Sequence, residues 1–474
     1  MRYFIFLFIF FALSVNKLLA QESVGFSNPE NIDPILDYRL PDWQYSNFYL
    51  DFDASSSGSY LKYDMDEQRS KRGNVGLIPS YNYYKESEDR IVQFNSSVGV
   101  GYSTRKQVTN SSISNSTENE LRVNSLDAVI NLNASIREYL SGEIFLYGNG
   151  NLMYDHYGNK NEEKTDGTLD AKVVRYERQF SVRPQLGIGF GRIRNITPVI
   201  RAVRLQERLG ALGGNVNFTG DDVLAAADQF AKYNGYQRTY DRPEKNFWSD
   251  MDDATSASLG TLSAFDMLYL TDVFDEAVGS RFEGWEVTAG AEFDYKNNLV
   301  REERPLMTDP VSRNHNISKT LGAFMSGRWY KNTSLDQQWG IVADLGLSYP
   351  LNDAGQGFSE LKRRTELSAE VNWLWTITDR ILLETSLQEL YTRNKISRTG
   401  FTGGQADEFS EWRNFLSLNV AVNYFIENQM QLNFSAGPNL QHRGDTENND
   451  ALGSRIFNWQ ANVGLRYYFS RKLY

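Results

Sequence analysis

The feature that most constrains the fold is an alternation of apolar and polar side chains with a period of two residues. It is clearest in the last segment, Arg455–Tyr474, where every second residue from Phe457 to Phe469 is apolar and most of the residues between them are polar. Side chains of a β-strand point alternately to opposite faces, so this segment is predicted to be a strand with one apolar face. The apolar face is longer than the roughly 9–11 residues that an oblique strand needs to cross a bilayer.

The same alternation recurs upstream, so the sequence predicts about fourteen strands in an all-β fold. The connections between them alternate between short turns and longer segments rich in Asn, Ser, Gly, Asp and Glu, as at 104–120, 156–170 and 297–315. Short turns at one end and long loops at the other are typical of a transmembrane antiparallel β-barrel. The predicted strands are 45–52, 75–84, 92–102, 126–136, 144–154, 174–190, 285–295, 321–329, 339–349, 367–375, 381–387, 416–426, 430–440 and the terminal segment.

Composition agrees with a membrane barrel and excludes several other classes of protein. Aromatic residues make up 14% of the chain, and several lie at predicted strand ends, where interfacial girdles are expected: Trp329, Trp339, Tyr349, Trp373 and Trp375. The mean hydropathy of −0.51 argues against helical membrane spans. There is no cysteine, which excludes disulfides and thiolate metal sites, and the net charge of −11 argues against a nucleic-acid partner.

Four residues of the terminal segment carry a likeness to a known family. Asn462, Gly464, Tyr467 and Phe469 resemble the C-terminal recognition signal of bacterial outer-membrane β-barrels: a polar residue, a glycine and two aromatic residues at set spacings. The resemblance implies that the barrel assembly machinery reads this strand and closes the barrel with it. It also implies that outer-membrane lipid surrounds the folded protein.

The chain divides into five predicted parts. Residues 1–20 read as a secretory signal peptide, with Arg2 before an apolar run and Ala20 at a plausible cleavage point. Residues 21–44 form a periplasmic lead-in, 45–192 the first half of the barrel, 193–280 an insert and 281–474 the second half. A periplasmic N-terminus puts the insert on the periplasmic side, where a short turn is expected.

The insert changes period and is predicted to be helical over about 195–279. Thr197-Pro198, Thr219 with Asp222, Pro243, and Ser263 with Asp266 are helix-start signals, and Gly235 is expected to end the second helix. Arg201, Arg204 and Arg208 share one face of the first helix. Three arrangements stay open. The insert is a plug in the lumen, whose arginines meet carboxylates such as Glu177, Glu286 and Glu292 of the wall; or it is a separate periplasmic domain; or it hides a distorted barrel strand.

The polar faces of the strands provide the candidate site. Charged side chains at this density need water or partners, so we expect them to line a lumen, where they select a solute or pair with one another. Fourteen strands are enough to leave a cavity. The lumen-lining candidates are Asp127, Glu143, Arg175, Glu177, Arg183, Glu286, Glu292, Asp344, Glu370 and Arg466.

Three functions remain open from the sequence. The first is an outer-membrane channel or transporter for small polar solutes, gated or plugged by the helical insert. The second is a non-conducting structural or docking subunit that binds an envelope protein partner. The third is a barrel-embedded lipid hydrolase or protease, for which His442 and Asp445 could be drawn as a pair, but no spacing enforces such a pair and no catalytic residue is assigned. No metal site and no cofactor are predicted.

Overall fold

Fourteen antiparallel strands form one sheet in sequence order, each strand pairing with the next. The computed structural model describes residues 26–62, 66–111, 117–212, 218–305, 310–351, 359–398, 407–427, 430–445 and 454–467. Each of the fourteen predicted segments corresponds to one observed strand, so the predicted all-β class and strand number are confirmed. The strands are β1 Trp43–Lys62, β2 Asp66–Glu86, β3 Arg90–Ser111, β4 Thr117–Ser141, β5 Ile144–Thr165, β6 Thr168–Asn195, β7 Phe282–Glu303, β8 Val311–Asn332, β9 Gln337–Pro350, β10 Ser359–Thr378, β11 Ile381–Arg398, β12 Asp407–Glu427, β13 Met430–Asp445 and β14 Ser454–Tyr467.

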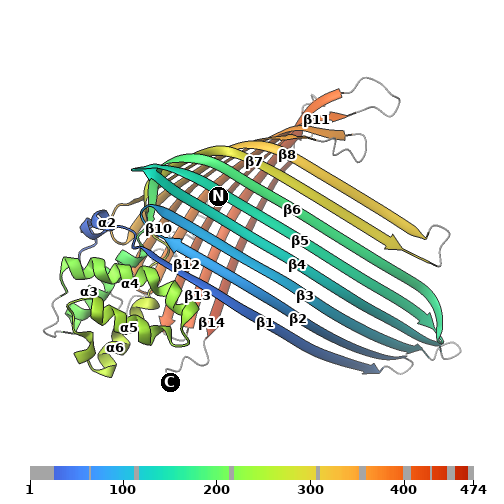
Figure 1. Ribbon diagram of the computed structural model, residues 1–474, viewed down its shortest axis with the longest axis horizontal. Helices are drawn as coiled ribbons and strands as arrows, with labels where there is room; N and C mark the ends of the chain where they lie inside the picture. Colours follow the sequence, from blue (N-terminus) through green and yellow to red (C-terminus); the bar gives the residue numbers. More distant parts are fainter. Residues whose placement is uncertain are drawn as a thin grey trace.

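The sheet curls, so that β12–β14 pass behind β1–β3 in Figure 1. Within the described ranges, register pairs join neighbouring strands only, and β1 and β14 are the two ends of the order. The predicted signal peptide and Phe469 of the assembly signal lie outside the described residues. Asn462, Gly464 and Tyr467 lie in β14, opposite Ser435, Asn433 and Met430.

The strands extend well past the predicted ends, and this corrects the prediction of long loops. In the segment expected to be a loop over 156–170, β5 runs to Thr165 and β6 begins at Thr168, with Asp166 and Gly167 as a tight turn at positive φ. Likewise β3 continues to Ser111. These parts are polar on both faces, so the hydrophobic period ends there while backbone pairing continues.

The two faces of the sheet differ in the way the alternation predicts. Leu186 is 71% exposed and Ile188 64% exposed on the outer face of β6, and their in-register neighbours continue an apolar surface around the sheet. Gly189 is on the inner face, where the ring of Phe145 from β5 covers it and leaves no room for a Cβ atom. Trp339, Trp373 and Trp375 stack at one end of the outer face.

The helices belong to the lead-in and to the segment between β6 and β7 (Figure 1). We call the described parts of residues 26–42 and 196–280 the cap. No helix in the described part of the chain is long and apolar enough to cross a membrane. The helices are α2 Asp33–Asp37, α3 Thr197–Ala211, α4 Gly220–Thr239, α5 Pro243–Ala254, η1 Leu259–Thr261, α6 Ala264–Thr271 and η2 Asp272–Phe274.

Two of the predicted helix starts are capping boxes. Thr219 with Asp222 opens α4, and Ser263 with Asp266 opens α6, each with reciprocal side-chain and backbone hydrogen bonds. The start predicted at Thr197-Pro198 is also confirmed, since α3 begins at Thr197. The Thr197 hydroxyl does not cap this helix; it accepts from the backbone N–H of Arg281. Gly235 does not end its helix.

Gly235 instead allows a close contact between the cap and the sheet. A Cβ atom there would lie 3.2 Å from the ring of Trp43, which is the first residue of β1. Beside it, the side chain of Asn47 donates to the backbone oxygen of Arg238 at 3.0 Å. Helix α4 therefore packs on the inner side of the start of β1, since the exposed apolar residues of that strand, Phe48 among them, occupy the alternate positions.

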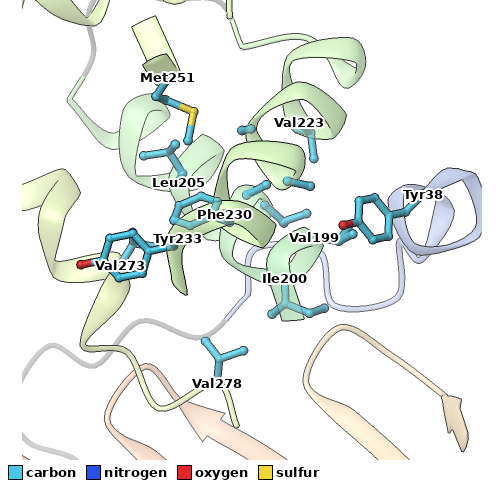
Figure 2. Close-up of a cluster of buried hydrophobic side chains, with 14 of the residues drawn as sticks. Tyr38, Val199, Ile200, Leu205, Val223, Phe230, Tyr233, Met251, Val273 and Val278 are labelled. Atoms are coloured by element: carbon cyan, nitrogen blue, oxygen red, sulfur yellow. The ribbon is translucent and has the colours of Figure 1, made fainter. Parts of the chain in front are cut away.

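The cap has its own hydrophobic core, drawn from segments far apart in the sequence. Figure 2 shows Tyr38, from the lead-in, pointing toward α3, with Phe230 and Tyr233 of α4 packed beside Leu205. Leu335, in the turn between β8 and β9, belongs to the same cluster. The lead-in, the insert and a strand turn thus form one packed unit at the end of the sheet that carries the short turns.

Candidate functional site

The inner face of the sheet carries a buried carboxylate between two arginines. Glu286 of β7 is 3% exposed; one of its oxygens lies 3.2 Å from Nη1 of Arg137 on β4, and the other lies 3.7 Å from Nη1 of Arg328 on β8. A carboxylate removed from water is stable only with such partners. The cluster carries an excess of one positive charge.

Further polar groups continue along the same face. The carboxylate of Glu292 accepts from Gln185 at 3.0 Å and lies 4.0 Å from Arg183. The carboxylate of Asp344 accepts from Ser326 at 2.6 Å and from Ser368 at 3.1 Å. These residues line one open cavity of about 350 Å³ together with the Glu286 cluster. Six of the predicted lumen-lining positions therefore line two cavities. Arg183, Glu286, Glu292 and Asp344 line the first, and Asp127 and Glu177 line the second.

The other predicted lining residues are more scattered. Arg175 lies 3.2 Å from Glu177 within β6. Glu143 lies in the turn between β4 and β5, and Glu370 lies on β10 opposite Gln388. The backbone of Arg466 pairs with Gln431, but its side chain lies outside the described residues.

The arginines of α3 do not meet the wall carboxylates as the plug arrangement required. Arg204 and Arg208 both donate to Glu276, through Nε atoms 2.6 Å and 2.7 Å from its oxygens, and all three residues are buried. The bonds to Glu276 raise the pKa of Arg204, although desolvation alone would lower it. Sequence spacing placed these residues on one helix face correctly but could not identify a partner beyond the end of α6.

Arg201 behaves differently from its two neighbours. It has no hydrogen bond or ion pair within the described part of the chain, and its Nε is buried. Burial lowers the pKa of its guanidinium, and the nearby charges of Tyr233 and Glu276 partly offset this. Arg201 lines a crevice of about 400 Å³ between the cap and the inner face of β1–β3.

The crevice brings together residues that sequence reasoning did not connect. Its walls include Tyr38 of the lead-in, Trp43 of β1 and Glu86 of β2, opposite Arg201 of α3. The aromatic residues within 38–45 are visible in the sequence, but they lie on both sides of the predicted boundary between the lead-in and the first strand. Their position therefore did not indicate a shared site. Only the packing of α4 against β1 shows that they face the insert.

Several bonds fix the cap to the turn end of the sheet. Arg281 follows the cap directly and is fully buried, and its Nε donates to the backbone oxygen of Val278 in the cap at 3.2 Å. Its Nη2 donates to the backbone oxygen of Asp336 at 2.6 Å and to the Thr376 hydroxyl at 2.7 Å. The carboxylate of Glu88, in the turn between β2 and β3, receives Arg192, Arg194 and the backbone N–H of Leu40. Because these anchors lie on separate turns, the cap is held at several points.

The histidines show no catalytic arrangement in the part of the chain that the structure describes. The ring of His442 lies edge-on to Trp412 with centroids 4.6 Å apart, and His315 contacts the Asn297 amide oxygen at 2.9 Å. The side chain of Asp445 lies outside the described residues. Within the residues that the structure describes, no group of three or more His, Asp or Glu side chains is arranged to hold a metal ion.

Comparison with known proteins finds likeness in structure only. No family model matches the chain, and no curated protein matches its sequence. The translocator domain of autotransporter NalP from Neisseria meningitidis aligns over 83% of this chain and 92% of its own, with 12% identity and a TM-score of 0.25. Pseudomonas aeruginosa OccK2 in complex with glucuronate aligns over 91% and 100%, with 10% identity and a TM-score of 0.22. The P. putida toluene transporter TodX aligns over 94% of each chain, with 9% identity and a TM-score of 0.24.

All three are outer-membrane β-barrels of Gram-negative bacteria. At these identities and TM-scores, the likenesses carry no functional argument for this chain. The chain's own features carry the architecture: fourteen antiparallel strands, an apolar outer face and a charged inner face. The fold is that of a transmembrane antiparallel β-barrel.

Proposed function

We propose that the protein is an outer-membrane channel for small polar solutes, with the cap narrowing its periplasmic mouth. The observation that carries the proposal is the difference between the two faces of the sheet. The inner face has buried and half-buried charges around an open cavity, whereas the outer face exposes large apolar side chains at the same heights. A lumen with such a surface holds water.

In this proposal, the position of the cap determines the path by which a solute leaves or enters the lumen. Its packing against Trp43 and its anchoring through Arg281 favour a fixed constriction at one end of the lumen, with the crevice beside Arg201 as a way past it. The predicted outer-membrane location and export signal belong to the same proposal.

The direct test is electrical. Protein that migrates faster on a gel unboiled than boiled is folded, and such protein is to be added to a planar lipid bilayer. We expect discrete conductance steps that increase in number with protein concentration. Folded protein that inserts but gives no conductance, and no swelling of liposomes in small sugars or amino acids, would contradict a channel.

A second function, docking of an envelope protein, is favoured by one surface of the cap. Phe265 on α6 is 84% exposed, and Leu268 and Tyr269 of the same helix are also exposed. Exposed apolar residues grouped on one helix are typical of an interaction surface. If docking is the function, native protein purified from outer membranes should carry a stoichiometric partner, and Phe265→Glu with Leu268→Glu should release it without changing conductance.

A further inference from the structure

The crevice between the cap and the inner face of the sheet has the size and lining of a small-molecule site. Its volume of about 400 Å³ falls within the range of about 300–1,000 Å³ that such sites occupy. It is bounded on one side by β1 and β2 and on the other by α3 and α4. It combines aromatic rings with Arg201, whose guanidinium has no hydrogen bond or ion pair within the described residues.

The aromatic part is a platform on the sheet. The rings of Trp43 and Tyr45 are stacked with centroids 5.8 Å apart, and Tyr84 lies 5.1 Å from Trp43 and 5.9 Å from Tyr45. The Glu86 carboxylate accepts from Nε1 of Trp43 at 3.1 Å, which fixes the orientation of the indole. Rigid rings of this kind bind flat apolar groups.

The charged part consists of two opposite charges on opposing walls. Arg201 has no hydrogen bond or ion pair within the described residues, and its Nε is buried. Tyr38 lines the same crevice; it is 1% exposed, and its hydroxyl is buried without a hydrogen-bond partner in the described part of the chain. Glu86 accepts hydrogen bonds from Trp43 and Tyr84 but has no ion pair among the described residues. Buried polar groups are nearly always satisfied, so Arg201 and Tyr38 indicate a ligand with acceptor atoms, and Glu86 provides the opposite charge on the facing wall.

We propose that the crevice binds a small zwitterion with an apolar ring, of amino-acid type. Its carboxylate pairs with Arg201, its ammonium pairs with Glu86, and its ring rests on the platform of Trp43, Tyr45 and Tyr84. The inference deepens the proposed channel function, on which it rests, by naming the class of solute that is selected at the constriction.

Binding is measured by titration calorimetry on the purified, folded full-length protein in detergent. The probes are phenylalanine, phenylpropionate, which lacks the ammonium, and phenethylamine, which lacks the carboxylate. A charge-assisted hydrogen bond contributes about tenfold or more in affinity, so each analogue should bind at least about tenfold more weakly than phenylalanine.

Two variants that replace a charged side chain by glutamine test which charge of the ligand binds to Arg201 and which binds to Glu86. In Arg201→Gln, phenylalanine should bind no better than phenethylamine, because the carboxylate has lost its partner. In Glu86→Gln, phenylalanine should bind no better than phenylpropionate, and the glutamine still accepts from Trp43. Arg242→Gln, an exposed arginine of the cap outside the crevice, is the matched control and should leave all three affinities unchanged.

Either of two results would overturn the site: no heat from phenylalanine at millimolar concentration with folded protein, or the same affinities in Arg201→Gln as in the parent. The experiment is independent of conductance. Binding without conductance would leave the site and reject the channel, whereas conductance without binding would leave the channel and reject the site.

Discussion

Arg204 and Glu276 form an ion pair in the interior of the cap, with Nε and Oε2 2.6 Å apart and both residues buried. Arg208 donates to the other oxygen of the same carboxylate. The three side chains join the first helix of the insert to the segment that leads back to the sheet.

Replacing Glu276 by Gln should therefore weaken the cap. Arg204 and Arg208 would lose the carboxylate that they share, and would keep Glu207 and Asp272, respectively, as ionic partners. Removing one partner of a buried pair costs up to about 3–5 kcal/mol. Hydrogen exchange should show faster exchange in α3 and α6, with the strands unchanged. Asp253→Asn, at an exposed position of α5, is the control; equal exchange in the two variants would show that the pair is unimportant.

The contact of Phe145 with Gly189 predicts a paired effect. Gly189→Ala places a methyl group where the Phe145 ring lies, and overpacking of this kind costs about 1–3 kcal/mol. We expect a lower urea midpoint for the folded band on gels. Phe145→Ala lowers the midpoint by itself, but adding Gly189→Ala to that variant should lower it further by much less than adding Gly189→Ala to the parent. Gly150→Ala, whose added Cβ meets nothing within 4 Å, should behave like the parent. An equal effect of Gly189→Ala in both backgrounds would place the strain elsewhere.

The direction of side chains on β11 can be tested with one charge at two neighbouring positions. Leu387 is exposed on the apolar outer face, and Gln388 points inward opposite Glu370. Leu387→Arg should destabilise folding in lipid vesicles by about 2–4 kcal/mol if the residue lies near the bilayer midplane, and Gln388→Arg should be tolerated. Equal folding yields would mean that the outer face does not contact lipid.

The lowered pKa of Asp222 predicts that the cap loses stability at low pH. Burial alone would raise its pKa, but hydrogen bonds from Ser256 and Thr219 outweigh this and lower the pKa from 3.8 to about 2. Because the folded value lies below the unfolded value, the stabilisation is complete above about pH 4 and is lost as the pH falls through about 2. Asp222→Asn should cost about 1 kcal/mol at neutral pH and flatten the stability profile in that window. The readout is cap protection during an acid titration; parallel profiles for the variant and the parent would contradict the assignment.

Glu286 predicts the ion preference of the lumen. Glu286→Gln leaves Arg137 and Arg328 without the carboxylate between them, so the local charge becomes more positive. We expect the reversal potential in a salt gradient to shift toward anion selectivity. Glu118→Gln, at an exposed position near the far end of β4, is the comparison and should shift it less. A shift no larger than that of Glu118→Gln would exclude the cluster from the conducting path.

Local signals in the sequence were sufficient for the strands and for the four helix starts at Thr197-Pro198, Thr219, Pro243 and Ser263. The alternation around Leu186 and Ile188 and the pair Thr219 and Asp222 each depend on residues close together in the chain, so a pattern identifies them. The length of the strands was wrong because segments such as 156–165 are polar on both faces. Backbone pairing does not require an apolar face, so residues 156–165 form a strand without an alternation of apolar and polar side chains.

The candidate site depended on contacts that no local pattern carries. The partner of Arg204 lies 72 residues away, and Arg137 and Glu286 are 149 residues apart. The alternation of side chains along each strand predicted which carboxylates point inward. Their arginine partners depend on which strands are neighbours, and the alternation does not give this. The crevice is lined by residues of the lead-in, of two strands and of α3. Nothing in the sequence indicated that these segments meet.

The composition of the cap core sets an order for assembly. Tyr38 precedes the first strand, the helices follow the sixth, and Leu335 follows the eighth, yet all belong to one cluster. The cluster is complete only when the turn between β8 and β9 has come next to the lead-in, where Leu335 donates to the Pro29 oxygen at 2.7 Å. During folding, the cap helices therefore stay incompletely packed until more than half of the strands, counted along the chain, are in place. The apolar faces of these helices stay exposed to water in that interval.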